Sequence, residues 1–149
     1  MIDVLLNNKC GKYLTYRDFI ECGETQEKLA IPNAPIQKET INALYELSIN
    51  ILDPVIEKFG DIHLTYGLCT HELGKKIKQR VAPKLDQHAS NELNKKGQPI
   101  CTRLGAAVDF IIPDMNMRVV ANWIATRTPF DRLYFYGDDR PIHVSYGPV

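Results

Sequence analysis

One carboxylate, Asp109, lies in the middle of the run LGAAVDFII (residues 104–112), which otherwise has the composition of a buried β-strand. An ionised carboxylate buried without a partner is strongly destabilising. A core strand that keeps one therefore normally places a cation, hydrogen-bond donors or a metal ion beside it. The chemistry of this chain depends on which of these partners Asp109 has.

Two histidines are candidates to meet Asp109. Strand alternation puts Asp109 on the opposite face from its apolar neighbours, and it puts His143 on one face of a second strand near the C-terminus. If the two strands are neighbours, the side chains converge, and His88 from a polar segment completes a set of two imidazoles and one carboxylate. Three such ligands leave the fourth position of a catalytic zinc ion open to water. The alternative is that Asp109 is a structural acid satisfied by hydrogen bonds and His143 a half-exposed strand residue.

The elements that must position these residues follow from periodicity. Apolar residues recur with helical spacing from Lys38 to Phe59, although Pro54 is expected to kink or split this helix, and Gly60 is a plausible end. A short helix is expected from Thr70 to about Arg80. Asp114 is expected to cap a later helix, in which Met117, Val120, Ala121 and Ile124 share a face.

Strands are predicted at residues 61–67 and 106–112, and residues 132–147 predict two strands joined by a turn at Gly137, Asp138 and Asp139. The aromatic run Tyr134 to Tyr136 is most simply a strand packed on both faces. Helices first and a mostly antiparallel sheet afterwards predict an α+β fold.

The composition limits the class of protein. A chain of 149 residues, 44% hydrophobic and 24% charged, fits one globular domain over residues 1–149. Eighteen basic residues balance eighteen acidic ones, so we expect neither nucleic acid nor an anionic membrane as a partner. The four scattered cysteines, with no signal-peptide layout and no membrane-spanning run, favour a cytoplasmic protein with reduced thiols.

The segments that carry the candidate ligands resemble a known family. LDQHASNELNKKGQPICTRLGAAVDF is similar to the S-Q-H-x-x-G-x-A-x-D zinc motif of the D-Ala-D-Ala carboxypeptidase family, with matches at Gln87, His88, Gly105, Ala107 and Asp109. PFDRLYFYGDDRPIHVSYGP resembles the family's F-D-Q-L strand followed by W-V-H-V-S, which makes His143 the third ligand. Upstream, YGLCTHELG is similar to the family's S-G-Y-R-S-P-E-L-N segment.

The resemblance runs from about Tyr13 to Tyr146 in the family's order. It implies the hedgehog/DD-peptidase fold and a zinc ion bound by His88, Asp109 and His143. It also implies hydrolysis of a peptide-like bond, as in the family's carboxypeptidases and endolysin-type peptidases.

Two departures concern the substrate. The family usually has two residues between the histidine and the glycine, whereas this chain has an insert at about 89–104, which we expect to form a flap or wall over the metal. Cys69 stands where the family has an arginine that helps to hold the substrate. A thiol cannot pair with a carboxylate as a guanidinium does, so Arg103 and Arg140 are the candidates for this role. Glu92 in the insert is predicted as a further substrate-binding residue.

A third departure concerns the general base. The family uses a glutamate shortly before the last histidine, and the corresponding positions here hold Tyr136 and Arg140. The nearest carboxylates are Asp138 and Asp139, and we predict Asp139 as the base, with Glu92 a more distant candidate. Two aspartates in a turn are also common as solvated turn formers.

The sequence therefore predicts a zinc-dependent hydrolase in which a metal-activated water attacks an amide, peptide or related bond of a small-molecule or peptide substrate. The alternative is a catalytically silent zinc-binding module of the same fold that recognises a ligand or a protein partner. The two differ in whether Asp138, Asp139 or Glu92 is placed to act on the water.

Overall fold

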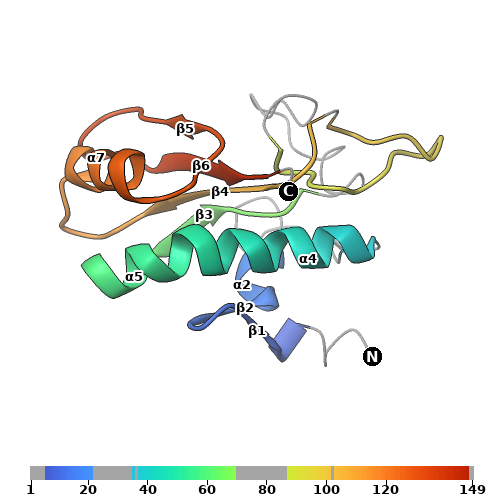
Figure 1. Cartoon of the computed structure of the whole chain (residues 1–149), viewed down its shortest axis with the longest axis horizontal. Coiled ribbons are helices and arrows are strands. Elements are labelled where there is room, and N and C mark those ends of the chain that lie inside the picture. The colour runs from blue at the N-terminus through green and yellow to red at the C-terminus, as the bar shows by residue number, and fades with distance from the viewer. Residues whose placement is uncertain (1–5, 22–34, 36, 70–86, 102, 148–149) are drawn as a thin grey trace.

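A helical layer packs against one face of an antiparallel sheet in the computed structural model, which describes residues 6–21, 35, 37–69, 87–101 and 103–147 (Figure 1). The predicted α+β class is confirmed. Among the described residues, no helix has the length and apolarity that crossing a membrane requires. The helices are α2 (Tyr16–Ile20), α4 (Lys38–Leu47), the π-helical turn η1 (Ser48–Leu52), α5 (Asp53–Phe59) and α7 (Met117–Arg127).

Six strands form two sheets in the described part of the chain. A small sheet pairs β1 (Lys9–Cys10) with β2 (Leu14–Thr15). The larger sheet has the order β3-β4-β6-β5, and each neighbouring pair is antiparallel. Its strands are β3 (His63–Tyr66), β4 (Ala106–Ile111), β5 (Leu133–Tyr134) and β6 (Ile142–Tyr146).

Pro54 does not split the predicted helix. It lies in the first turn of α5, directly after η1, and Figure 1 shows α4 and α5 as one nearly continuous rod. A proline cannot donate to the carbonyl four residues earlier and its ring crowds that carbonyl. The wider π turn accommodates this defect. Gly60 ends the helix at a φ of +93°, as predicted.

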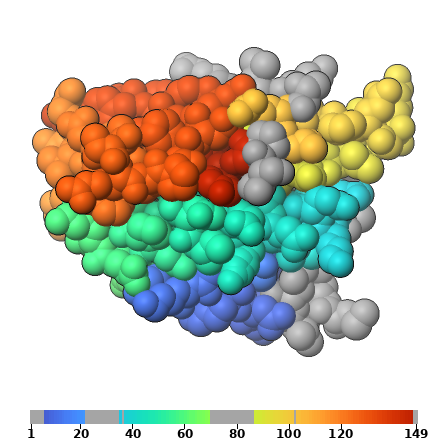
Figure 2. Space-filling model, in the orientation of Figure 1, coloured from blue at the N-terminus to red at the C-terminus, as the bar shows by residue number. Residues whose placement is uncertain are grey.

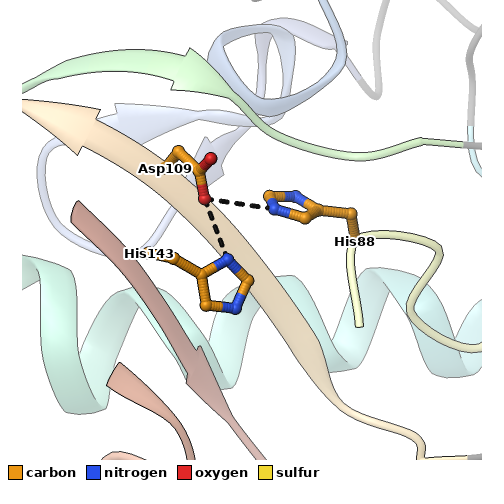
Figure 3. A group of neighbouring side chains, drawn as sticks. All are labelled: His88, Asp109 and His143. Atoms are coloured by element: carbon orange, nitrogen blue, oxygen red, sulfur yellow. Dashed lines mark hydrogen bonds and ion pairs between the residues drawn. The ribbon is translucent and has the colours of Figure 1, made fainter. Parts of the chain in front are cut away.

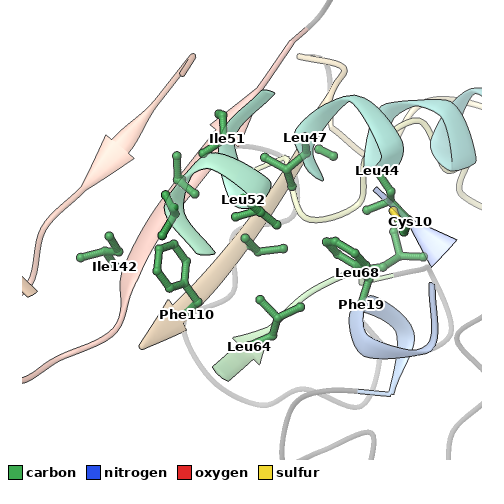
Figure 4. Close-up of a cluster of buried hydrophobic side chains, with 14 of the residues drawn as sticks. Cys10, Phe19, Leu44, Leu47, Ile51, Leu52, Leu64, Leu68, Phe110 and Ile142 are labelled. Carbon is green, nitrogen blue, oxygen red and sulfur yellow. The ribbon is translucent and has the colours of Figure 1, made fainter. Parts of the chain in front are cut away.

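The core lies between this long helix and one face of the sheet. The inward residues of the two central strands, Val108 and Phe110 on β4 and Ile142 and Val144 on β6, are fully buried. Figure 4 shows Phe110 in the same cluster of buried side chains as Ile51 and Leu52 of the long helix. The predicted face of α7 joins the same cluster, with Met117, Val120, Ala121 and Ile124 buried. Alternation therefore leaves Asp109 and His143 on the opposite face of the sheet.

The start of α7 corrects one prediction. The helix is capped by Asn116, whose side chain accepts a hydrogen bond from the Arg118 backbone N–H at 2.8 Å. Asp114 instead adopts a φ of +60° in the preceding turn, a left-handed conformation that aspartate tolerates. The predicted strand 61–67 is shorter and covers His63–Tyr66. The helix predicted from Thr70 to about Arg80 lies outside the described residues.

The insert has a buried base and an outer tip. Ala89, Ser90 and Glu92 are buried, whereas the tip, with a bridge between Leu93 and Pro99, projects beyond the end of the sheet (Figures 1 and 2). The carboxylate of Glu92 accepts hydrogen bonds from the Gln37 N–H at 2.9 Å and the Thr40 hydroxyl at 2.7 Å. Glu92 thus satisfies donors in the first turn of α4, where a negative charge is favourable. The insert is fastened to the long helix rather than spread over the sheet.

Removing this contact should destabilise the fold. We expect Glu92→Ala to lower the free energy of unfolding by about 2 to 3 kcal/mol, because one buried and one partly buried donor lose their acceptor. Urea unfolding measures the change. The matched control is Glu39→Ala, since Glu39 is an exposed acid in the same helical turn and should change stability by less than about 0.5 kcal/mol. Equal losses of stability in the two variants would contradict a structural role of Glu92 at the start of α4.

Candidate metal centre

Four side chains lie in one row across the larger sheet. The register places Tyr66 of β3 opposite Asp109 of β4, Asp109 opposite His143 of β6, and His143 opposite Tyr134 of β5. The strands that carry Asp109 and His143 are therefore neighbours in the sheet, as the convergence of the two side chains requires. Directly paired residues on one face of a sheet have their Cβ atoms about 5 Å apart, which is close enough for side-chain contact.

His88 approaches this row from the base of the insert. Its Nε2 lies 3.2 Å from Asp109 Oδ1, and His143 Nδ1 lies 2.9 Å from the same oxygen (Figure 3). One ligand atom from each residue lies within 4.8 Å of the others. The three residues predicted as metal ligands therefore converge, and the group they form could hold a metal ion.

A tight turn fixes the position of His88. The His88 carbonyl accepts the Cys69 N–H at 2.9 Å, and its ring Nδ1 lies 2.7 Å from the Gly67 carbonyl oxygen. The flanking residues Gln87 and Ser90 have φ values of +64° and +52°, which are uncommon for residues other than glycine. The backbone accepts this strained geometry only where surrounding contacts enforce it.

Two other residues of the sequence motif supply those contacts. The Gln87 side-chain amide donates to the Leu104 carbonyl at 2.8 Å and to the Gly147 carbonyl at 3.3 Å, which ties the turn to the start of β4 and the end of β6, at one end of this strand pair. The Ser90 hydroxyl donates to the Gly105 carbonyl. Gly105 has a φ of +116°, and a Cβ there would collide with the Tyr146 carbonyl. Gln87 and Gly105 therefore shape the backbone that presents His88.

The site is buried on its histidine side and open at the carboxylate. His88 and His143 are 2% and 3% exposed, whereas the Asp109 side chain is 27% exposed. Burial raises the pKa of Asp109, but hydrogen bonds from His143 and His88 outweigh this and lower it to about 2. The carboxylate is therefore ionised at neutral pH, and a negative ligand stands at the mouth of the site.

The hydrogen-bonding pattern favours a cation among these atoms. The Gly67 carbonyl can only accept, so His88 Nδ1 carries a hydrogen. A neutral His88 then directs the lone pair of Nε2 at Asp109 Oδ1, and two acceptors face each other. A second proton on His88, which makes the hydrogen bond to Asp109, or a bound cation removes this conflict. Within the described residues, His143 Nε2 is buried without a hydrogen-bond partner. If a metal ion were bound through His143 Nδ1, the ring hydrogen of His143 would be on Nε2.

Tyrosine rings cover both imidazoles. Tyr66 stacks on His88 with ring centroids 3.9 Å apart, and Tyr134 stacks on His143 at 4.9 Å. Sequence reasoning missed both as parts of the site. Alternation could place each on a strand face, but only the pairing register shows that Tyr66 stands opposite Asp109 and Tyr134 opposite His143.

The two aspartates predicted as catalytic lie in the turn before β6. Asp138 pairs with Arg118, with Oδ1 2.9 Å from Nε, and its carbonyl accepts the Met117 N–H at 2.7 Å. Asp139 is exposed in the same turn. Across the described ranges, neither aspartate has a hydrogen bond or ion pair to His88, Asp109 or His143. Asp138 is thus engaged at the start of α7, and Asp139 as general base stays a prediction.

The predicted substrate contacts also have structural partners or lie in solvent. Arg103 forms a bidentate pair with Asp131, at 2.6 and 2.5 Å, and Arg140 is exposed. Glu92 is buried against the first turn of α4, so binding substrate would require it to leave that helix. Cys69 is a small buried residue, 1% exposed, whose backbone supports His88.

Comparison of the chain with protein-family models, with curated proteins and with solved structures finds no match.

Metal binding tests the centre directly. We expect the protein to bind one equivalent of zinc, and His88→Ala, Asp109→Ala and His143→Ala each to weaken binding at least about 100-fold, because a ligand is lost. Competition with a chromophoric chelator measures the affinity. His63→Ala is the matched control, since His63 is an exposed histidine on β3 and should leave binding unchanged. Full binding in all three ligand variants would refute the centre.

The backbone at Gly105 gives a separate test. Gly105 and Gly97 both have positive φ, at +116° and +77°, but only at Gly105 would a Cβ meet other atoms within 4 Å. We expect Gly97→Ala to cost about 1 kcal/mol of unfolding free energy through strain alone, and Gly105→Ala about 3 kcal/mol or more. Gly105→Ala should also weaken zinc binding. Losses of similar size in both variants would show that the close contact is not important.

Proposed function

We propose that this protein is a zinc-dependent hydrolase of the hedgehog/DD-peptidase fold, which cleaves an amide, peptide or related bond of a small substrate with water as the nucleophile. The observation that carries the proposal is a three-ligand set, His88, Asp109 and His143, that is closed on its histidine side and open at the carboxylate. Structural zinc sites normally use four protein ligands, whereas catalytic sites use three and leave one position free.

The donor set suits zinc. Two imidazole nitrogens and one carboxylate oxygen form a common catalytic zinc environment, although iron(II) also accepts two histidines and one carboxylate. When bound, zinc acts as a Lewis acid and lowers the pKa of a water molecule at its open position. The test of metal binding should therefore include iron(II) and manganese(II) beside zinc.

The chain's own groups orient the ligands. The Gly67 carbonyl holds the hydrogen of His88 on Nδ1, which leaves Nε2 available as a ligand. Tyr66 and Tyr134 cover the imidazole faces and restrict ring rotation. Asp109 carries the negative charge that offsets a divalent ion in a buried setting. In this proposal Asp139 takes the proton from the attacking water and later returns it to the leaving group.

A catalytically silent zinc-binding module is the second candidate. It is favoured by the position of the carboxylates, because Glu92 is bound to the start of α4 and Asp138 to Arg118. A zinc domain that lost its base keeps the ligand geometry and uses the open position to bind a ligand. This candidate shares the metal centre with the hydrolase and differs only in turnover.

A substrate screen with the zinc-loaded protein separates the candidates. We expect hydrolysis of amide or peptide substrates that disappears in His143→Ala, and we expect Asp139→Asn to lower kcat about 100-fold with zinc binding retained. Glu39→Gln, which neutralises an exposed acid on α4, serves as the control and should retain full activity. Unchanged kcat in Asp139→Asn would remove Asp139 as the base. Tight zinc binding with no turnover of any substrate would favour the silent module.

A further inference from the structure

Three consecutive aromatic residues are exposed at β5 and directly after it, and the first of them, Tyr134, stacks on His143. Tyr134, Phe135 and Tyr136 are 40%, 36% and 62% exposed, which overturns the prediction of a strand packed on both faces. They make up three of the seven exposed large hydrophobic residues among the described part of the chain. Clustered exposed aromatic surface on a folded protein is typical of a binding site.

Tyr134 is the exposed ring of the row across the sheet. Four rings surround Asp109 or extend its row. Two of them, His88 and His143, are almost fully buried, and Tyr66 is half-buried. Tyr134 is therefore the most exposed of the four rings. One side of Tyr134 stacks on His143 with an angle of 18° between the ring planes. Among the described residues β5 is the last strand of the sheet, so no further strand from this part of the chain pairs with its outer side. A molecule bound at the metal and extending past β5 therefore meets the Tyr134 ring.

Contacts with α7 and β6 hold the aromatic segment, Tyr134 to Tyr136, in place. The Arg118 guanidinium lies 4.8 Å from the centre of the Phe135 ring, and the same arginine pairs with Asp138. The register of Leu133 with Val144 and of Tyr134 with His143 fixes the strand itself. Tyr134 is thus presented by an anchored segment, and a ligand that stacks on it need not order a loose loop.

We propose that Tyr134 determines substrate specificity by stacking against a flat apolar group, such as an aromatic side chain, that lies a short distance from the bond positioned at the metal. The inference rests on the metal centre of the proposed function and adds a chemical class for its substrate. Aromatic rings gain from offset stacking beyond the area they bury. A substrate without a flat group forgoes this contact.

Two hydroxamates test the proposal, because both bind zinc through the same head group. Acetohydroxamate carries a methyl group, whereas 3-phenylpropionohydroxamate carries a phenyl ring on a short linker. We expect the zinc-loaded protein to bind the phenyl compound about tenfold more tightly, and Tyr134→Ala to reduce this ratio to about one. Isothermal titration calorimetry gives both Kd values. The ratio cancels any change in the metal site itself, since both compounds share it.

The matched control is Tyr45→Ala, because Tyr45 is a tyrosine on α4 with a similar exposure of 42%. It should retain the tenfold ratio. A ratio that survives in Tyr134→Ala overturns the role of Tyr134 and leaves the proposed hydrolase untouched. Failure of the zinc-loaded protein to bind acetohydroxamate overturns the open metal position, and with it both proposals.

Discussion

The carboxylate oxygen of Asp109 that faces both imidazoles is the point on which the site depends. It receives His88 from the base of the insert and His143 from the neighbouring strand, at 3.2 and 2.9 Å. Burial alone would favour the neutral acid, yet these two contacts keep the pKa of Asp109 at about 2. The charge that attracts a cation is therefore maintained by the same residues that would share the cation.

The hydrophobic core and the metal centre both depend on the same pairing register of β4 and β6. Val108 and Phe110 face the long helix, and Asp109 between them faces the other way. A slip of one residue between β4 and β6 would bring Asp109 into the apolar layer and expose Phe110, at a large cost in free energy. The hydrophobic layer thus fixes the face of the sheet on which Asp109 and His143 lie.

Local patterns predicted what depends on local physics. Helical period gave the long helix and the buried face of α7, and strand alternation gave the faces of Asp109 and His143. Periodicity could not join His88 to them, because it lies 21 positions before Asp109 and no period spans a turn and a loop; its residue type suggested a third ligand, and the resemblance supported that choice. Asp114 and Asn116 are both good caps, and the choice between them depends on where the chain leaves β4.

Tertiary contacts explain the remaining errors. Glu92 in a polar insert has the appearance of a functional carboxylate, and only its contact with the first turn of α4 reveals a structural task. Nothing in the residues 89–104 indicates that this helix lies beside them. The exposure of Tyr134 depends on β5 being the last strand of the sheet, and strand order is a property of the whole fold that alternation does not encode.

The turn that carries Asp138 and Asp139 decides whether the metal centre can have a nearby base. Asp138 holds this turn against α7 through Arg118 and through the Met117 N–H. The ion pair is exposed, with side-chain exposures of 61% and 54%, so its loss is a minor cost to stability. The stronger restraint is the backbone contact to Met117, which satisfies a donor at the start of a helix. A shift of Asp139 toward the ligands must preserve that contact, so rotation within the turn is easier than displacement of the whole segment.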